Sequence, residues 1–279
     1  MTPTWTQEII ETEMAGAMPL RIYGADTASR AAPVVLHMHG GAFTGGSLES
    51  GADVAAVLVA AGAVVVSADY PVGEAHPFPV PLKAAYEALL WSDKAKARIA
   101  GKTSRLYVAG AEAGGNLAAA LAMMARDQQF PALAGQILIS PMLDACLATS
   151  SLRLADAGPV GCKWADGWHA YLGSADKAGH PYAAPMTATR LGGLAPALVI
   201  TSGDDPLRDE ALSYARRLRA AGVEADEHVV PAPTGWPCTI DSEDDTACDC
   251  IKALAPVIGR FFEQTRAGPA KRQARHADI

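Results

Sequence analysis

The stretch Gly110-Ala111-Glu112-Ala113-Gly114-Gly115-Asn116 marks a tight turn between a strand and a helix. The apolar run 106–109 precedes it, and an alanine- and leucine-rich segment over 116–126 begins directly after it. Glycines flanking such a turn relieve its strained backbone and let the strand and the helix pack closely. The sequence therefore predicts an α/β unit that holds the Glu112 side chain at the end of a strand.

Apolar runs alternate with helical patterns on both sides of this turn. Strands are predicted at residues 20–23, 34–38, 63–68, 106–109, 136–140, 197–201 and 225–230, and helices at 53–61, 82–92, 116–126, 209–221 and 247–264. The central runs are continuously apolar, as expected for strands covered on both faces. The alternation predicts one α/β domain over residues 1–279 with a doubly wound, mainly parallel sheet.

Two segments depart from this alternation. Residues 146–181 interrupt it and carry Trp164, Trp168 and Tyr171, so we expect a cap insertion that lies over the top of the sheet. Residues 268–279 are polar and basic, and we expect them to form a flexible tail.

Composition excludes several classes of protein. Half of the 279 residues are hydrophobic, which allows a large core, and the net charge of −7 argues against nucleic acid as a partner. No apolar run approaches the roughly 20 residues of a membrane span, and the N-terminus lacks the pattern of a secretory signal. We therefore expect a cytoplasmic protein.

The cysteines fit that expectation. An odd, scattered set is typical of reduced thiols in a cytoplasmic protein, and here it consists of Cys146, Cys162, Cys238, Cys248 and Cys250. Cys248 and Cys250 hint at metal binding, but residues two apart on a helix do not share a face. No metal site is predicted.

Three motifs could carry chemistry. In a Gly-x-Ser-x-Gly nucleophile elbow the central side chain is held above the sheet, and here that place belongs to Glu112. The turn His39-Gly40-Gly41-Ala42-Phe43 follows the run 34–38, where it could donate backbone N–H groups to an oxyanion hole or be an ordinary glycine-rich turn. Asp205 follows the run 197–201, where it could be a catalytic acid or an acidic residue that begins a helix.

The order of motifs HGGAF, DY, HPFP, GAEAGGNLA, ILISPMLD and DPLRDE resembles the hormone-sensitive-lipase family of α/β-hydrolases, from about residue 19 to about residue 264. The resemblance implies the α/β-hydrolase fold, a Ser-Asp-His triad, a cap and no cofactor. It also implies an oxyanion hole at Gly40, Gly41 and Ala113, with His39, Ala42 and Phe43 as neighbouring binding residues.

The sequence departs from that family at two of the three triad positions. Glu112 replaces the serine nucleophile, and Thr234 in Thr234-Gly235-Trp236 stands where the resemblance places the histidine base. Asp205 retains the acid position. The chain before His39 is short, so we expect a reduced cap.

These departures leave two interpretations of function. The favoured one is a degenerate, esterase-like pseudoenzyme that binds a small molecule in a pocket above the elbow, or a protein partner, with a homodimer possible. The alternative is a hydrolase of carboxylic esters or other acyl compounds that attacks through Glu112. The resulting acylated Glu112 would need a general base to activate water, which Thr234 cannot supply. We also expect the Glu112 carboxylate to accept a hydrogen bond from the amide of Gly41 or Ala113 and so to occupy the oxyanion hole itself.

Overall fold

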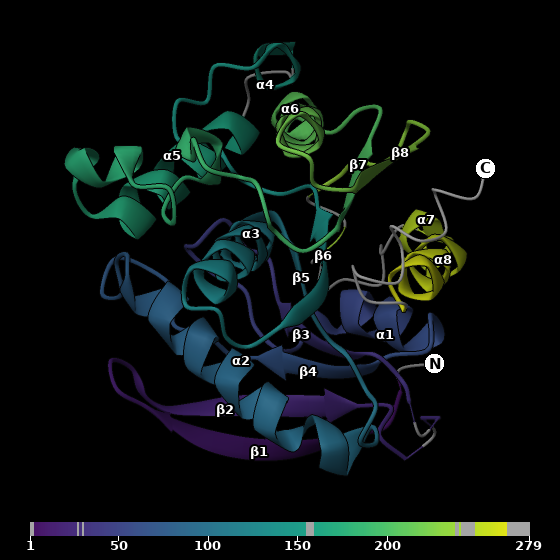
Figure 1. Ribbon diagram of the computed structural model, residues 1–279. Coiled ribbons are helices and arrows are strands. Elements are labelled where there is room, and N and C mark those ends of the chain that lie inside the picture. Colours follow the sequence, from purple (N-terminus) through teal and green to yellow (C-terminus); the bar gives the residue numbers. More distant parts are fainter. Residues whose placement is uncertain are drawn as a thin grey trace.

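The computed structural model describes residues 3–26, 28–29, 31–154, 159–237, 240 and 249–266, and these form an eight-stranded sheet (Figure 1). The strands are β1 (Trp5–Thr12), β2 (Gly16–Tyr23), β3 (Val34–Met38), β4 (Val64–Ala68), β5 (Leu106–Ala111), β6 (Leu133–Ile139), β7 (Ala197–Ser202) and β8 (Ala225–Val230). Their order across the sheet is β1-β2-β4-β3-β5-β6-β7-β8. β1 and β2 pair antiparallel, as do β2 and β4, and the remaining neighbours pair parallel. The predicted α/β-hydrolase architecture with a mainly parallel sheet is confirmed.

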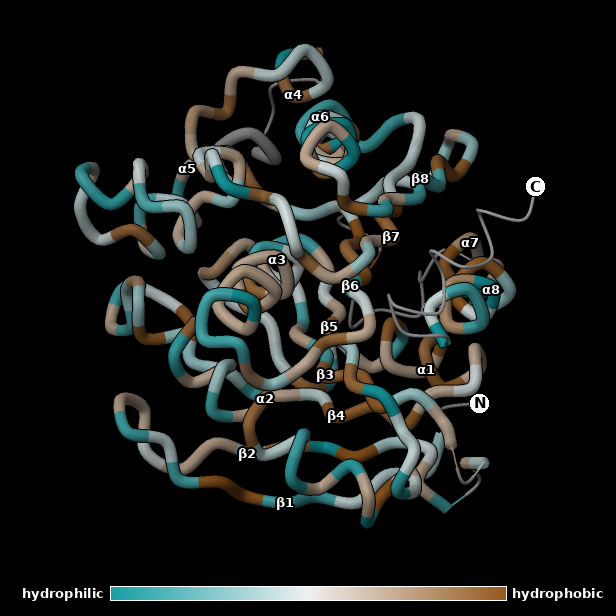
Figure 2. Tube along the Cα trace, viewed as in Figure 1, coloured by the Kyte–Doolittle hydropathy of each residue, from teal (hydrophilic) through white to brown (hydrophobic). Residues whose placement is uncertain are grey.

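Helices cover both faces of this sheet. The helices are α1 (Ala52–Ala60), α2 (Val80–Ile99), α3 (Glu112–Asp127), α4 (Ser150–Leu154), α5 (Pro159–Leu172), α6 (Arg208–Ala220), α7 (Asp249–Lys252) and α8 (Ala255–Thr265), with short 3₁₀ turns at η1 (Ala175–Gly179) and η2 (Pro185–Thr187). α2, α3 and α6 bury their apolar sides in one hydrophobic cluster, and α1, α7 and α8 bury theirs in a second. β3, β4 and β5 lie between the two clusters and are buried at every residue, which explains their continuously apolar sequences. Figure 2 shows this hydrophobic band along the central strands.

The first strand was not predicted. β1 is an edge strand whose described partner is β2, and it leaves Trp5 46% and Ile9 62% exposed. Its sequence mixes polar and apolar residues because one edge and much of its surface face solvent. Composition alone could not identify such a strand.

The last predicted helix, 247–264, is wrong as a single element. Its described part consists of two helices, α7 and α8, separated by a turn. Pro256 lies in the first turn of α8, where its missing N–H costs nothing, whereas inside a longer helix it would break a hydrogen bond. The proline therefore starts a new helix instead of continuing the earlier one.

The predictions for the cysteines, the tail and membrane spans have different outcomes. Cys250 is disulfide-bonded, so the prediction of reduced thiols is wrong for this residue, while Cys146 is a free, exposed thiol. Cys238, Cys248 and the predicted tail 268–279 lie outside the described residues. Among the helices that the structure describes, none is long and apolar enough to cross a membrane.

Candidate active site at the turn between β5 and α3

Glu112 is the first residue of α3 and follows the last residue of β5. Its φ angle of 50° lies in the left-handed region that non-glycine residues rarely adopt, and the residue is only 1% exposed. A Cβ atom on Gly110 would lie 2.2 Å from the Gly114 backbone, and one on Gly114 would lie 2.1 Å from the Met38 carbonyl oxygen. The strained, glycine-dependent turn predicted from the sequence is therefore present.

The Glu112 carboxylate is held by four donors. Its Oε2 atom accepts hydrogen bonds from the backbone amides of Gly41 at 2.7 Å and Ala42 at 2.8 Å. Its Oε1 atom accepts one from Trp164 Nε1 at 2.7 Å and lies 3.0 Å from Lys163 Nζ. The predicted contact with Gly41 is confirmed, and the second amide is that of Ala42 instead of Ala113. This partner set satisfies a buried carboxylate that would otherwise be costly to take out of water.

The turn after β3 aims its two amides at one point. Gly41, Ala42 and Phe43 have φ angles of 104°, 51° and 62°, so three successive residues are left-handed. Successive amides in such a turn form a concave anion site. The turn is thus an oxyanion-hole-like nest, with the Glu112 carboxylate as its anion.

His39 fixes the start of that turn without contributing charge. Its Nδ1 lies 2.8 Å from the carbonyl oxygen of Gly40, and the Tyr70 hydroxyl donates to the His39 carbonyl oxygen at 2.7 Å. The His39 ring also stacks on Tyr70, with centroids 4.3 Å apart. Burial lowers the pKa of His39 to about 4, so its imidazole is neutral at pH 7.

Helix α5 covers the turn from above. Trp164, which is fully buried, and Lys163 both reach Glu112 from this helix. A Cβ on Gly167 would lie only 1.9 Å from the Ala42 carbonyl oxygen, so a glycine is needed where α5 meets the turn. The segment predicted as a cap therefore contains a helix packed directly on the candidate site.

Aromatic side chains extend this covering layer. Trp164, Trp168 and Tyr171 follow one another at spacings of four and three residues, which places them on one side of α5. The Tyr171 ring stacks on Phe43 with centroids 3.7 Å apart, and Trp168 lies beside both rings. Each of these side chains is nearly or fully buried. The space immediately over Glu112 is thus occupied by α5, where the sequence suggested a ligand pocket.

Asp205 lies after β7, as predicted, and is 1% exposed. Its Oδ2 accepts a hydrogen bond from the Thr201 hydroxyl at 2.6 Å, and its Oδ1 accepts one from the Leu207 amide at 2.8 Å. Burial raises the pKa of the Asp205 carboxyl, and the negative charge of Glu112 raises it further. Glu112 and Asp205 are therefore close enough for their charges to interact.

Thr234 forms hydrogen bonds with Asp204, the residue before Asp205. Its amide donates to Asp204 Oδ2 at 2.7 Å, and its hydroxyl donates to Asp204 Oδ1, also at 2.7 Å. Burial alone would raise the pKa of Asp204, but hydrogen bonds from Thr234, Gly235 and Ser202 outweigh it and hold that pKa well below its usual range. The carboxylate that engages Thr234 is thus Asp204, for which no motif of the sequence predicted a role.

Lys163 and Gly167 were also missed. The aromatic stripe of α5 was visible in the sequence, but no local pattern connects Lys163 to a carboxylate on a distant turn. Within the described part of the chain, no cluster of three or more His, Cys, Asp or Glu residues could hold a metal ion.

Comparisons with known proteins show the family and the fold. Residues 35–234 match a family model described as the alpha/beta hydrolase fold. Carboxylesterase NlhH of Mycobacterium tuberculosis is 38% identical over 216 residues, which cover 75% of this chain and 67% of that protein. The crystal structure of esterase LipW from Mycobacterium marinum is 32% identical with a TM-score of 0.78, covering 93% of this chain and 82% of that one. The gibberellin receptor GID1B of Arabidopsis thaliana is 32% identical over 209 residues, which cover 70% of this chain and 57% of the receptor.

Proposed function

Since this chain belongs to the hormone-sensitive-lipase-like esterases of the α/β-hydrolase fold, we propose that it is a member without serine-hydrolase activity that serves as a binding protein. The observation that carries the proposal is the position of the Glu112 carboxylate. It accepts hydrogen bonds from the backbone amides of Gly41 and Ala42, which in an esterase would stabilise the oxyanion. The anion is built into the protein, so these two amides are not free for a substrate oxyanion.

The other parts of the machinery support the same proposal. A serine hydrolase needs a hydroxyl nucleophile, a base that takes its proton, and free oxyanion donors. Glu112 offers no hydroxyl, and Thr234 cannot serve as the base. Thr234 is instead held on Asp204 by two hydrogen bonds. An acyl-enzyme has no route to form or to hydrolyse.

The alternative, a hydrolase that attacks through Glu112, fits the geometry less well. Oε2 is engaged by two amides and Oε1 by Trp164 and Lys163, so an attacking oxygen would have to give up these partners. A substrate would also have to displace α5. A binding role has a precedent in the family, because one relative is named as a receptor.

A hydrolysis assay tests the proposal. Purified full-length protein is incubated with p-nitrophenyl acetate and p-nitrophenyl butyrate, with carboxylesterase NlhH as positive control. We expect rates equal to the buffer background for both the wild type and Glu112→Gln. Turnover by the wild type that Glu112→Gln abolishes would reject the proposal and establish the hydrolase that uses Glu112.

A further inference from the structure

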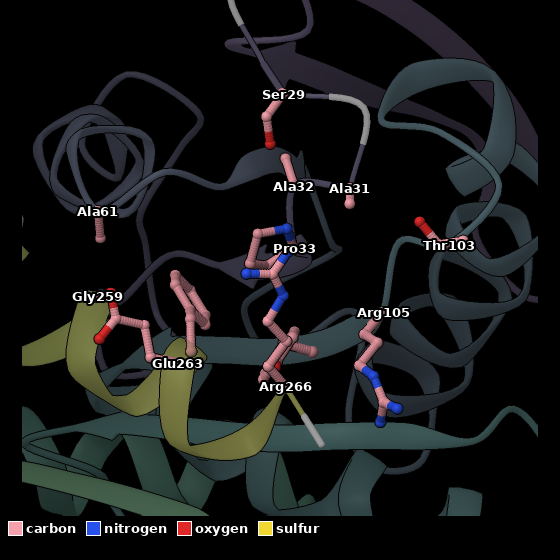
Figure 3. A pocket seen from close by; sticks show the side chains of 12 residues that line it. Ser29, Ala31, Ala32, Pro33, Ala61, Thr103, Arg105, Gly259, Glu263 and Arg266 are labelled. Carbon is pink, nitrogen blue, oxygen red and sulfur yellow. The ribbon is translucent and has the colours of Figure 1, made fainter. Parts of the chain in front are cut away.

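A cleft of about 580 Å³ lies at the end of the sheet opposite Glu112. It opens where β3 and β5 begin, between α8 and the loops that lead into these two strands (Figure 3). Tyr107 lines it from β5, five residues before Glu112, which corresponds to about 16 Å of extended strand. The cleft is therefore separate from the candidate active site and independent of the function proposed for it.

Small side chains create this space. Ala61 at the end of α1 and Gly259 on α8 face it, together with Ala32 in the loop before β3. Larger apolar residues close its base, because Tyr107 and Phe262 are almost fully buried and pack against each other with ring centroids 4.9 Å apart. The volume lies within the range of roughly 300–1,000 Å³ that small-molecule sites occupy.

The rim of the cleft carries charge. Arg266 extends from the end of α8 over the middle of the opening, with Glu263 on one side and Arg105 and Thr103 on the other (Figure 3). Among the residues that the structure describes, no hydrogen bond or ion pair engages the side chains of Arg105, Arg266 or Glu263. Two arginines and one glutamate leave a local positive excess in a protein whose net charge is −7.

An apolar base beneath guanidinium groups that have no partner among the described residues suits one kind of ligand. Guanidinium forms charge-assisted, often bidentate hydrogen bonds with carboxylates and phosphates. Pro33, Ala61 and Phe262 would contact an apolar body below that head group. We infer that this cleft binds a small organic anion, with its apolar part on the base and its carboxylate or phosphate on Arg266.

Isothermal titration calorimetry with three probes of one shape tests this inference. The probes are 1-naphthoate, 1-naphthyl phosphate and the neutral 1-naphthamide, titrated into full-length protein at low ionic strength. We expect saturable binding of at least one anion, and the anion bound more tightly identifies the head group. The amide should bind about fivefold more weakly than that anion, as expected for one partly exposed charge pair.

Variants localise the site. Arg266→Gln should weaken binding of the preferred anion about fivefold and should leave binding of 1-naphthamide unchanged. Ala61→Leu should fill the cleft and weaken binding of all probes by about tenfold or more. The matched control is Arg216→Gln on α6, an exposed arginine far from the cleft, which should have no effect. Thermal unfolding of each variant confirms that it is folded.

Four results would overturn the inference. The first is the absence of saturable binding for every probe, and the second is equal affinity for the anions and the amide. The third is an equal effect of Arg216→Gln and Arg266→Gln on binding of the preferred anion, and the fourth is full affinity in Ala61→Leu. Because the cleft is remote from Glu112, esterase activity in the wild type would reject the proposed function without affecting this test.

Discussion

Replacing Glu112 by glutamine exchanges one carboxylate oxygen for an NH₂ group. This group cannot accept hydrogen bonds, so the donors on one side of the residue lose their acceptor. The glutamine oxygen can accept from Gly41 and Ala42, in which case its NH₂ group faces Trp164 Nε1 and Lys163 Nζ. In the opposite orientation the NH₂ group faces the two amides. Either way, about two donors lose their acceptor. An unsatisfied buried donor costs about 1–3 kcal/mol, so we expect Glu112→Gln to lower the free energy of unfolding by about 2–6 kcal/mol.

Urea denaturation followed by far-ultraviolet circular dichroism measures this loss. The matched control is Glu11→Gln, on the exposed face of β1, which should change the free energy of unfolding by less than about 0.5 kcal/mol. A Glu112→Gln protein as stable as the control would show that the Glu112 carboxylate is not a structural anion. The Gly41 and Ala42 amides would then not depend on its charge.

Further predictions address the covering helix, the pH response and the lost catalytic groups. Gly167→Ala should push α5 away from the turn and lower the free energy of unfolding by about 1–3 kcal/mol, whereas Gly179→Ala, whose added Cβ meets nothing within 4 Å, should be neutral in the same urea titration. Burial holds the pKa of His39 at about 4, below that of the unfolded chain, so the unfolded state binds more protons between those values. The stability that this residue contributes is present above about pH 6.5 and lost as the pH falls toward about 4, and in paired urea titrations His39→Asn should reduce that loss. Glu112→Ser alone should not turn over p-nitrophenyl butyrate efficiently. The double variant Glu112→Ser with Thr234→His should hydrolyse it measurably faster than the single variant. Efficient turnover by the single variant would show that another group serves as base.

The fold could be predicted where a strand is buried along its whole length and its sequence is therefore continuously apolar. β3, β4 and β5 are buried at every residue, so their apolar runs indicated strands directly. β1 escaped prediction because an edge strand with an exposed surface has no such run. The split between α7 and α8 depended on Pro256, which a helical pattern over the whole segment obscured.

The candidate site was predictable in its local parts only. The glycines around Glu112 and the turn at Gly41 are each encoded within a few residues, and together they indicated that the carboxylate meets a backbone amide. The contributions of Lys163 and Trp164 depend on how α5 packs over the sheet, which no short pattern specifies. Nor could spacing show that Thr234 would be held by Asp204, since β7 and the segment after β8 meet only in the folded chain.

Intact-protein mass spectrometry during exposure to p-nitrophenyl butyrate tests whether Glu112 can be acylated. The wild-type protein is quenched in acid after short incubation, and a parallel sample receives hydroxylamine, which would convert an acyl anhydride on Glu112 to a hydroxamate. We expect an unchanged mass in both samples, because the carboxylate is held by the Gly41 and Ala42 amides and by Trp164 of α5. A butyryl adduct, or a hydroxamate on the peptide that contains Glu112, would contradict it.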